Sequence, residues 1–98
     1  MQRGAWLLRL KEGREAEYLD AHRQVWPDLI KAARAAGIKN HSVYVVGSTV
    51  FAYAEAEDLE ATMNTLGKAE VTLKWNRFMS EFMDDTEGVA LAEVFHFD

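Results

Sequence analysis

The pattern that most limits the possible folds of this chain is a β-hairpin between residues 41 and 56. β-Branched and aromatic residues are frequent in segments 41–46 and 49–56, and Gly47-Ser48 separates the two segments. Two-residue loops that contain glycine are typical turns between antiparallel strands. The chain is therefore predicted to contain an antiparallel sheet.

Strand patterns also occur near both ends of the chain. Apolar residues alternate over residues 3–10, with Trp6 and Leu8 on one face of the predicted strand. Residues 84–88 are acidic and contain a glycine, which indicates a loop. Residues 91–97 then alternate as a final strand.

Helical periodicity occupies the two intervals between these strands. From residue 13 to about residue 36, apolar side chains recur at spacings of three and four. Pro27 lies inside this segment, where it removes a helical hydrogen bond, so we expect a kink or a short break there. A second helical region starts at Asp58, is interrupted at Gly67, and continues as a separate piece over about residues 70–83.

The order of elements is β, α, β, β, α, β, which predicts a ferredoxin-like α+β fold with the helices on one face of an antiparallel sheet. The strands carry more aromatic surface than one helical layer is expected to cover. The residues concerned are Phe51, Tyr53, Phe95 and Phe97. Because a large exposed apolar patch favours association, we expect two copies to pack face to face as a homodimer of the α/β-barrel type.

Size and charge exclude several classes of function. A chain of 98 residues is expected to form one domain spanning residues 1–98. Its net charge of −5 repels nucleic-acid phosphates and anionic lipids alike, so neither is an expected partner. It contains no cysteine, which excludes disulfides and thiolate chemistry. We find no signal-peptide pattern and no apolar run that could span a membrane, so the cytoplasm is the expected location.

A candidate proton-transfer pair lies on the first helix. His22 follows Tyr18 by one helical turn, so both side chains extend from one face. An imidazole can donate or accept a proton near neutral pH, and a phenol can hold a substrate hydroxyl. Trp26 and Trp75 lie on the two flanking helical segments and offer flat apolar surface for the C–H face of a sugar. The alternative is purely structural: the first pair lines an amphipathic helix and the tryptophans fill the core.

A metal site is the other use that the histidines allow. His22, His41 and His96 are not spaced as a local ligand pair, so such a site requires that folding bring all three together. No cysteine or clustered carboxylate supports it. Nucleotide-binding, phosphate-loop and calcium-loop motifs are also missing from the sequence. We therefore predict neither a metal nor a cofactor.

The segment from Tyr18 to Leu29 has the pattern Y-x3-H-x3-W-P-x-L. It resembles the signature of the L-rhamnose mutarotase family, and the resemblance extends over nearly the whole chain. A tryptophan-proline pair four residues after a histidine is rare by chance, so the motif is fairly specific. Other matching features are the opening strand, Asn40, Tyr44, Phe51-Ala52, Trp75, Phe78-Met79 and Glu93-Val94-Phe95.

The resemblance implies a dimeric ferredoxin-like isomerase that interconverts the α and β anomers of a 6-deoxyhexose without metal or cofactor. It implies that His22 is the catalytic proton donor and that Tyr18, His41, Trp75 and Asn76 bind the substrate. Two positions depart from the family, because His41 replaces a tyrosine and Asn76 replaces a second tryptophan. The family's proline- and asparagine-rich loop before the last strand is missing as well. These departures alter the pocket walls, so L-fucose stands beside L-rhamnose as an expected substrate.

Two other functions fit the same architecture. Small dimeric ferredoxin-like domains include cofactor-independent monooxygenases that act on quinol-like aromatic substrates, and a histidine with tryptophan and tyrosine can serve that chemistry. A non-enzymatic dimer that binds a small metabolite through the same pocket is the other alternative. The joined motif of Tyr18, His22 and Trp26-Pro27 favours the mutarotase.

Overall fold

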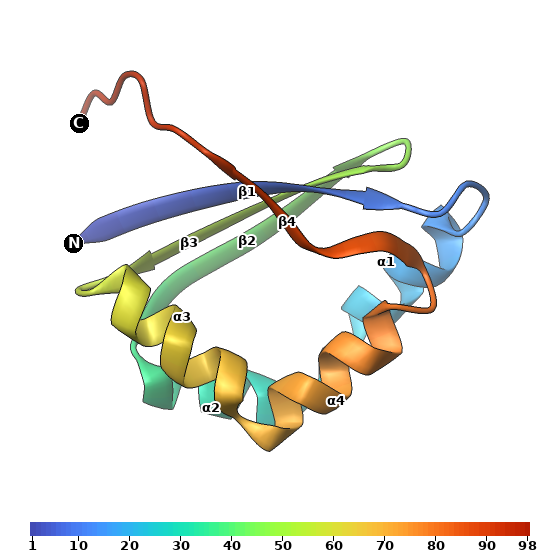
Figure 1. Cartoon of the computed structure of the whole chain (residues 1–98), viewed down its shortest axis with the longest axis horizontal. Coiled ribbons are helices and arrows are strands. Elements are labelled where there is room, and N and C mark those ends of the chain that lie inside the picture. Colours follow the sequence, from blue (N-terminus) through green and yellow to red (C-terminus); the bar gives the residue numbers. More distant parts are fainter.

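Figure 1 shows the computed structural model, in which helices lie on one side of a four-stranded antiparallel sheet. The structure describes the whole chain except the side chains of residues 85–87. Its elements, in chain order, are β1 (Gln2–Leu10), α1 (Glu15–Arg23), α2 (Pro27–Ala36), β2 (Ile38–Val46), β3 (Thr49–Ala56), α3 (Leu59–Lys68), α4 (Glu70–Met79) and β4 (Met83–Leu91).

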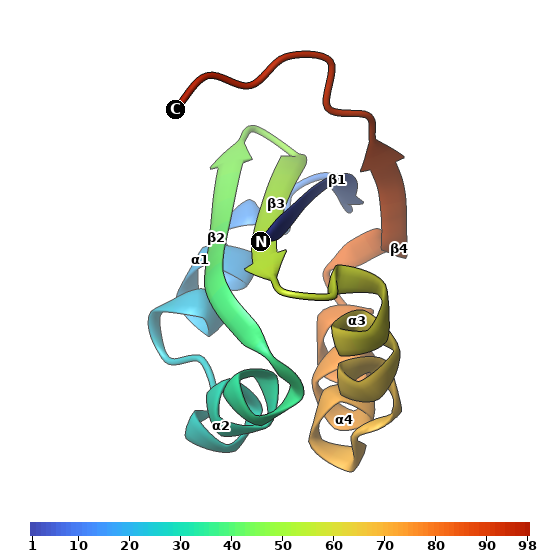
Figure 2. The same ribbon diagram turned by 90° about the vertical axis from the view of Figure 1, so that its left-hand side faces the viewer.

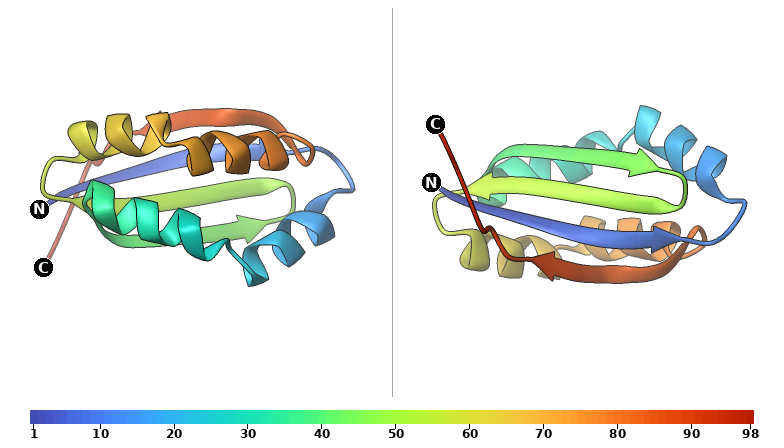
Figure 3. Two further views of the ribbon diagram at one scale, coloured as in Figure 1. Left: turned by 90° about the horizontal axis from the view of Figure 1, so that it is seen from below. Right: turned by 90° about the horizontal axis from the view of Figure 1, so that it is seen from above.

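The strand order β2-β3-β1-β4 confirms the predicted ferredoxin-like topology. The hairpin turn at Gly47-Ser48 joins β2 to β3, as predicted, and every neighbouring pair of strands is antiparallel. Figure 2 shows α2 on one side and α3 with α4 on the other side of the helical layer. Figure 3 shows that all of these helices cover the same face of the sheet, whereas the opposite face has no helix over it.

The predicted break in the first helical segment is confirmed at Pro27. Helix α1 ends at Arg23, and Pro27 is the first residue of α2. A proline suits this position because the first helical N–H has no partner within the helix. Trp26, which precedes it, has the extended ψ of 126° that a residue before proline prefers. The chain therefore changes direction between two short helices.

The second helical region breaks two residues later than predicted. Asp58 caps α3 as expected, with its carboxylate accepting a hydrogen bond from the Ala61 N–H at 3.1 Å. The predicted interruption at Gly67 is wrong, because α3 continues to Lys68. A glycine inside a helix costs only about 1 kcal/mol, which the surrounding packing can offset. Ala69, with ψ 138°, ends α3 and precedes α4.

The predicted final strand is displaced along the chain. Strand β4 spans Met83–Leu91, so the loop expected at residues 84–88 falls within it, and the strand expected at residues 91–97 does not form. Gly88 adopts a φ of +76°, and the pairing of β4 with β1 has register shifts next to it. This irregularity lets an acidic, glycine-containing segment remain in the sheet.

The two faces of the sheet have different environments. On the helix side lies a core cluster of seven buried residues: Leu10, Tyr18, Val50, Trp75, Met79, Phe82 and Met83. On the other side Phe51 and Tyr53 lie as predicted, next to exposed apolar residues of the neighbouring strands. Phe95 and Phe97 do not belong to this face, because they follow β4 on the tail and are largely exposed. Among the described residues, no helix is long and apolar enough to cross a membrane.

Candidate active site

Helix α1 brings Tyr18 and His22 into direct contact. Their ring centroids are 4.2 Å apart, and the Nδ1 atom of His22 lies 3.0 Å from the main-chain carbonyl oxygen of Tyr18. A carbonyl oxygen can only accept a hydrogen bond, so Nδ1 must carry the hydrogen and donate it. In the neutral imidazole, Nε2 then has a free lone pair. This nitrogen is the one that can exchange a proton with a ligand.

Tyr18 contributes a phenol that stays protonated. The residue is 4% exposed and belongs to the core cluster. Burial raises the pKa of Tyr18 to about 12, because the phenolate would be poorly solvated there. At neutral pH the hydroxyl is therefore uncharged and able to donate a hydrogen bond.

Trp75 of α4 holds the imidazole from the side. Its ring is edge-on to the rings of His22 and Trp26, and the ring centroids are 5.5 Å apart for His22 and 5.0 Å apart for Trp26. Trp75 is only 8% exposed and is a member of the core cluster, so most of its ring is already covered by protein. Its packing restricts the orientation of His22, and only a small part of its ring is left for a ligand.

His41 lies on the helix side of β2, in line with Val43 and Val45, which pack against the core cluster. Its side chain is reached by water, yet burial lowers the pKa of His41, and the charge of nearby His22 lowers it further. The imidazole of His41 is therefore neutral at pH 7. The two histidines interact electrostatically, although they come from elements that are separate in sequence.

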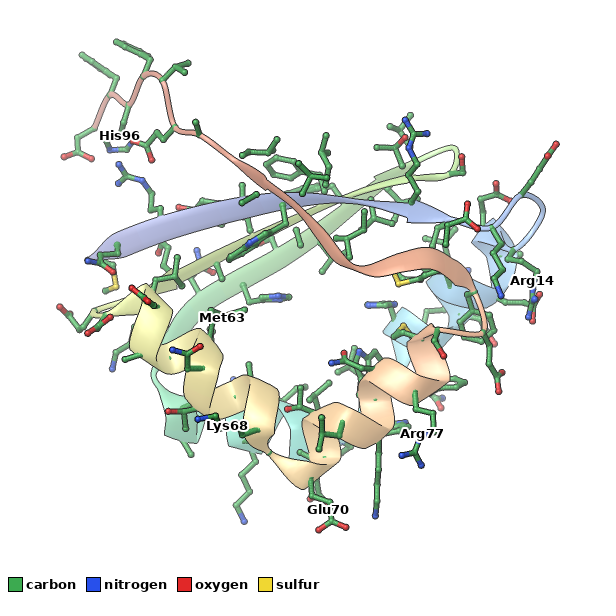
Figure 4. The ribbon with its side chains drawn as sticks, viewed as in Figure 1. Arg14, Met63, Lys68, Glu70, Arg77 and His96 are labelled. Atoms are coloured by element: carbon green, nitrogen blue, oxygen red, sulfur yellow. The ribbon has the colours of Figure 1, made fainter. Side chains whose placement is uncertain are left out.

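Asn76 and His96 do not lie among the rings of Tyr18, His22 and Trp75. Asn76 follows Trp75 on α4 and is exposed, and none of the described contacts joins it to His22. His96 lies on the C-terminal tail beyond the uncovered side of the sheet, where its ring is 2.7 Å from Asp98 (Figure 4). The single chain therefore does not bring the three histidines together. The described residues also contain no other group of three metal-ligating side chains.

Two further residues on the helix side of the sheet were not among the candidate site residues of the sequence analysis. Thr72 lies one turn before Trp75 on the buried face of α4, and its hydroxyl has no hydrogen-bond partner among the described residues. A buried polar atom without a partner is unusual in a folded protein. Trp6 lies on the helix side of β1 and is half-buried. The signal for Trp6 was its position in the strand alternation, which aligns it with Leu8.

A surface depression lies away from the histidines. It is situated where α2 and α4 begin, and its lining residues are Trp26, Pro27, Asp28, Glu70, Val71 and Lys74. Figure 4 shows Glu70 pointing away from the sheet. The depression meets the ring cluster at Trp26, which contacts Trp75, but it contains none of the histidines.

Taken together, the helix side of the sheet holds two imidazoles, a protonated phenol and several aromatic rings. Imidazoles can deliver and remove protons near neutral pH, and aromatic rings bind the apolar face of a sugar. The chain offers no thiol, because it has no cysteine. The arrangement suits proton transfer to and from a neutral, hydroxyl-rich ligand.

A family model and a sequence relative of this chain carry the same family description. The family model described as L-rhamnose mutarotase matches residues 3–97. The L-rhamnose mutarotase of Bacteroides thetaiotaomicron is 33% identical over 100% of both chains.

Solved structures agree at the level of the fold. The crystal structure of L-rhamnose mutarotase from Formosa agariphila superposes with a TM-score of 0.80 at 27% identity, over 100% of both chains. A dimeric ferredoxin-like protein from an uncultured marine organism has a TM-score of 0.69 at 17% identity, over 98% of this chain and 96% of that one. At that identity the second match shows the shared fold alone.

Proposed function

The chain belongs to the L-rhamnose mutarotase family, and on that premise we propose that it is an isomerase that interconverts the α and β anomers of L-rhamnose. The observation that carries the proposal is the setting of His22. Its Nδ1 is engaged by the Tyr18 carbonyl, its ring is held edge-on by Trp75, and its Nε2 is left for a ligand. Such an imidazole is equipped for acid/base catalysis.

The proposed reaction needs only proton transfers. The sugar's ring oxygen gains a proton while the anomeric hydroxyl loses one, and the bond between the anomeric carbon and the ring oxygen breaks to give an open aldehyde. Rotation about the next carbon–carbon bond presents the other face of the aldehyde. Ring closure reverses both proton transfers, so nothing is oxidised or reduced. We therefore propose a cofactor-free mechanism.

Each candidate side chain has a proposed role in this scheme. His22 is the acid and base at the ring oxygen, and Tyr18 binds a sugar hydroxyl with its protonated phenol. His41, neutral at pH 7, accepts a hydrogen bond from another hydroxyl. Trp75 orients His22 and contributes the remaining exposed part of its ring as a wall. Asn76 binds a hydroxyl at the water-accessible edge of α4.

Replacement of His22 by Ala tests the central assignment. Removal of a general acid/base costs roughly 10²–10⁴-fold, so we expect the acceleration of anomer exchange by His22→Ala to fall at least about a hundredfold. Saturation-transfer proton NMR on the anomeric signals of L-rhamnose measures the exchange rate directly. His96→Ala is the control, because His96 lies on the tail. Wild-type exchange rates in His22→Ala would contradict the assignment.

The identity of the sugar is a separate question in the same assay. His41 and Asn76 change the walls of the pocket relative to the family, so L-fucose is measured beside L-rhamnose at equal concentrations. We expect the larger acceleration with L-rhamnose, because the relatives bear that name. A larger effect on L-fucose would assign the protein to the other 6-deoxyhexose.

We also propose that the protein forms a homodimer through the uncovered face of the sheet. One row of apolar side chains crosses all four strands of this face, because Tyr44 pairs with Phe51, Phe51 with Leu7, and Leu7 with Val89. Tyr44 and Val89 are more than 60% exposed in the single chain. A continuous apolar surface of this kind favours a second, self-complementary copy.

A further inference from the structure

Trp6 has a position that the proposed mechanism does not yet use. It pairs with Ala52, whose neighbours Val50 and Ala54 are fully buried, so Trp6 lies on the helix side of the sheet. The ring is half-buried and is not among the side chains that pack against the core cluster. Part of a large aromatic surface on the helix side is therefore left uncovered.

Gly4 decides where this ring lies. A Cβ atom at Gly4 would be 2.9 Å from Cη2 and 3.2 Å from Cζ2 of Trp6, so the indole leans along β1 over the glycine. The same Cβ atom would be 2.5 Å from Cδ2 of Leu59 on α3. The absence of a side chain at Gly4 is thus what lets the indole occupy this place over the strand.

The strand register places this ring in the same row as His41. Gly4 and His41 both pair with Ala54, from opposite sides, so all three share one row on the helix side. Neighbouring strands are about 4.8 Å apart, so Gly4 and His41 are separated by about 10 Å across a small alanine. The indole over Gly4 and the imidazole of His41 therefore border the same region of the sheet. His41 in turn interacts with His22 across the space between sheet and helices.

We propose that Trp6 is the aromatic wall of the sugar site on the sheet side, and that Gly4 is required to place it there. The inference rests on the proposed function. A pyranose has an apolar C–H face, and an indole ring is the side chain best suited to bind such a face. Trp75 is nearly covered by the core, so it offers only a small part of its ring, and a less buried tryptophan is needed to cover most of this face. Trp6 binds the substrate and takes no part in proton transfer.

Kinetics of Trp6 variants test the proposal. An aromatic contact contributes about 0.5–1.5 kcal/mol, so Trp6→Ala should raise KM for L-rhamnose about threefold to tenfold and leave kcat within about twofold. Trp6→Phe keeps an aromatic ring and most of the packing volume, so its KM should lie between those of the wild type and Trp6→Ala. Equal loss of kcat in both variants with an unchanged KM would overturn the proposal. Thermal unfolding of each variant confirms that the measured samples are folded.

Binding can be observed without turnover measurements. The three tryptophans give three indole N–H signals in a ¹⁵N-correlated spectrum, and Trp6→Phe identifies the signal of Trp6 by removing it. Titration of the wild-type protein with L-rhamnose should shift this signal in a saturable way. A Trp6 signal that stays fixed while the wild type accelerates anomer exchange would refute only the present inference. Absence of acceleration by the wild type would instead refute the proposed function.

Gly4→Ala tests the second half of the proposal. The new methyl group would displace an indole that is otherwise unchanged, so KM should rise as it does in Trp6→Ala although the ring is still present. Gly67→Ala is the matched control, because a Cβ atom at Gly67 has no neighbour within 4 Å. An unchanged KM in a folded Gly4→Ala variant would show that the placement of the indole is irrelevant to binding.

Discussion

One hydrogen bond determines which nitrogen of His22 is available for chemistry. The Tyr18 carbonyl occupies Nδ1 at 3.0 Å, and this acceptor is supplied by the same helix one turn earlier. The tautomer is therefore set by local backbone geometry, independently of any ligand. The Tyr18 ring, 4.2 Å away, restricts the imidazole further. A single helical turn thus supplies both the proton carrier and the groups that orient it.

The buried phenol of Tyr18 predicts a dependence of stability on alkaline pH. The pKa is about 12 in the folded chain against about 10 in an unfolded one, so the folded state keeps a proton that the unfolded state releases. The free energy of unfolding is therefore unaffected below pH 10 and falls as the pH rises from 10 to 12, by roughly 2–3 kcal/mol. Tyr18→Phe should lack this decline in urea denaturation at pH 9, 10 and 11.

Tyr44→Phe serves as the control in that series. Its ring is 62% exposed in the single chain, so in a monomeric Leu7→Glu background the substitution removes a phenol without removing a buried one. If Tyr18→Phe loses stability with pH as steeply as the wild type, burial of the Tyr18 hydroxyl does not control its ionisation.

At the scale of elements, the break between α1 and α2 shapes the ring cluster. A continuous helix would carry Trp26 onward in the same direction as His22. The extended backbone at Trp26 instead turns the chain, and its ring stacks on Phe78 at 5.8 Å and meets Trp75 edge-on. Pro27 thereby contributes to the site without contacting His22, since it determines where one helix ends and the next begins.

Gly37 at the end of α2 tests how much a side chain at a left-handed helix cap destabilises the fold. Gly37 caps this helix with a φ of +114°, and a Cβ atom there would lie 2.7 Å from the Thr62 hydroxyl, which donates a hydrogen bond to the Ala36 carbonyl. Gly37→Ala should therefore lower the free energy of unfolding by about 1–3 kcal/mol. Chemical denaturation monitored by circular dichroism measures the change.

Gly67→Ala is the opposite case within the neighbouring helix. Gly67 is a helical residue of α3 with open space around it, so alanine there should raise stability by about 0.5–1 kcal/mol. A similar loss of stability in both variants would indicate that neither backbone conformation nor the Thr62 contact distinguishes the two glycines.

In the whole molecule, the candidate site lies on the helix side of the sheet, and the opposite face is free to contact a second copy of the chain. The helices, the ring cluster and both candidate histidines of the site lie on one side, as Figures 1 and 3 show for the helices. The C-terminal tail lies on the other side, where Arg3 binds Glu93 at 2.8 Å. Association through the uncovered face therefore leaves the helix side free for a ligand.

Leu7→Glu tests the proposed dimer. Leu7 lies in the middle of the apolar row, between Phe51 and Val89, so a carboxylate there would be buried without a partner in the dimer. We expect the wild type to sediment at twice the chain mass and Leu7→Glu to sediment as a monomer. Leu73→Glu, at a half-exposed position on α4, should remain dimeric. A monomeric wild type would contradict the proposal.

The final strand shows why part of the fold could not be predicted. Residues 91–97 alternate as a strand does, but a strand forms only where a partner offers unpaired backbone. Strand β1 pairs with β4 up to Ala5 and Leu91, and only three residues of β1 remain beyond Ala5, so most of the tail would have no partner strand. The side chain of Arg3 binds Glu93 there instead. Apolar and polar residues do alternate in the tail, but the register between β1 and β4 determined which residues paired. The loop predicted at residues 84–88 was wrong for the same reason.

Four features could be predicted from the order of residues alone: the hairpin, the helix break at Pro27, the ferredoxin-like order of elements and the proximity of Tyr18 to His22. Each of these depends on backbone preferences or on spacings within one or two helical turns, which neighbouring residues set. Three other features follow from how the elements pack: Trp75 is nearly covered, His41 interacts with His22, and the indole of Trp6 lies over Gly4 in the row of His41. Those relations depend on the register among β1, β3 and β2, and a shift of one residue would turn each side chain to the opposite face.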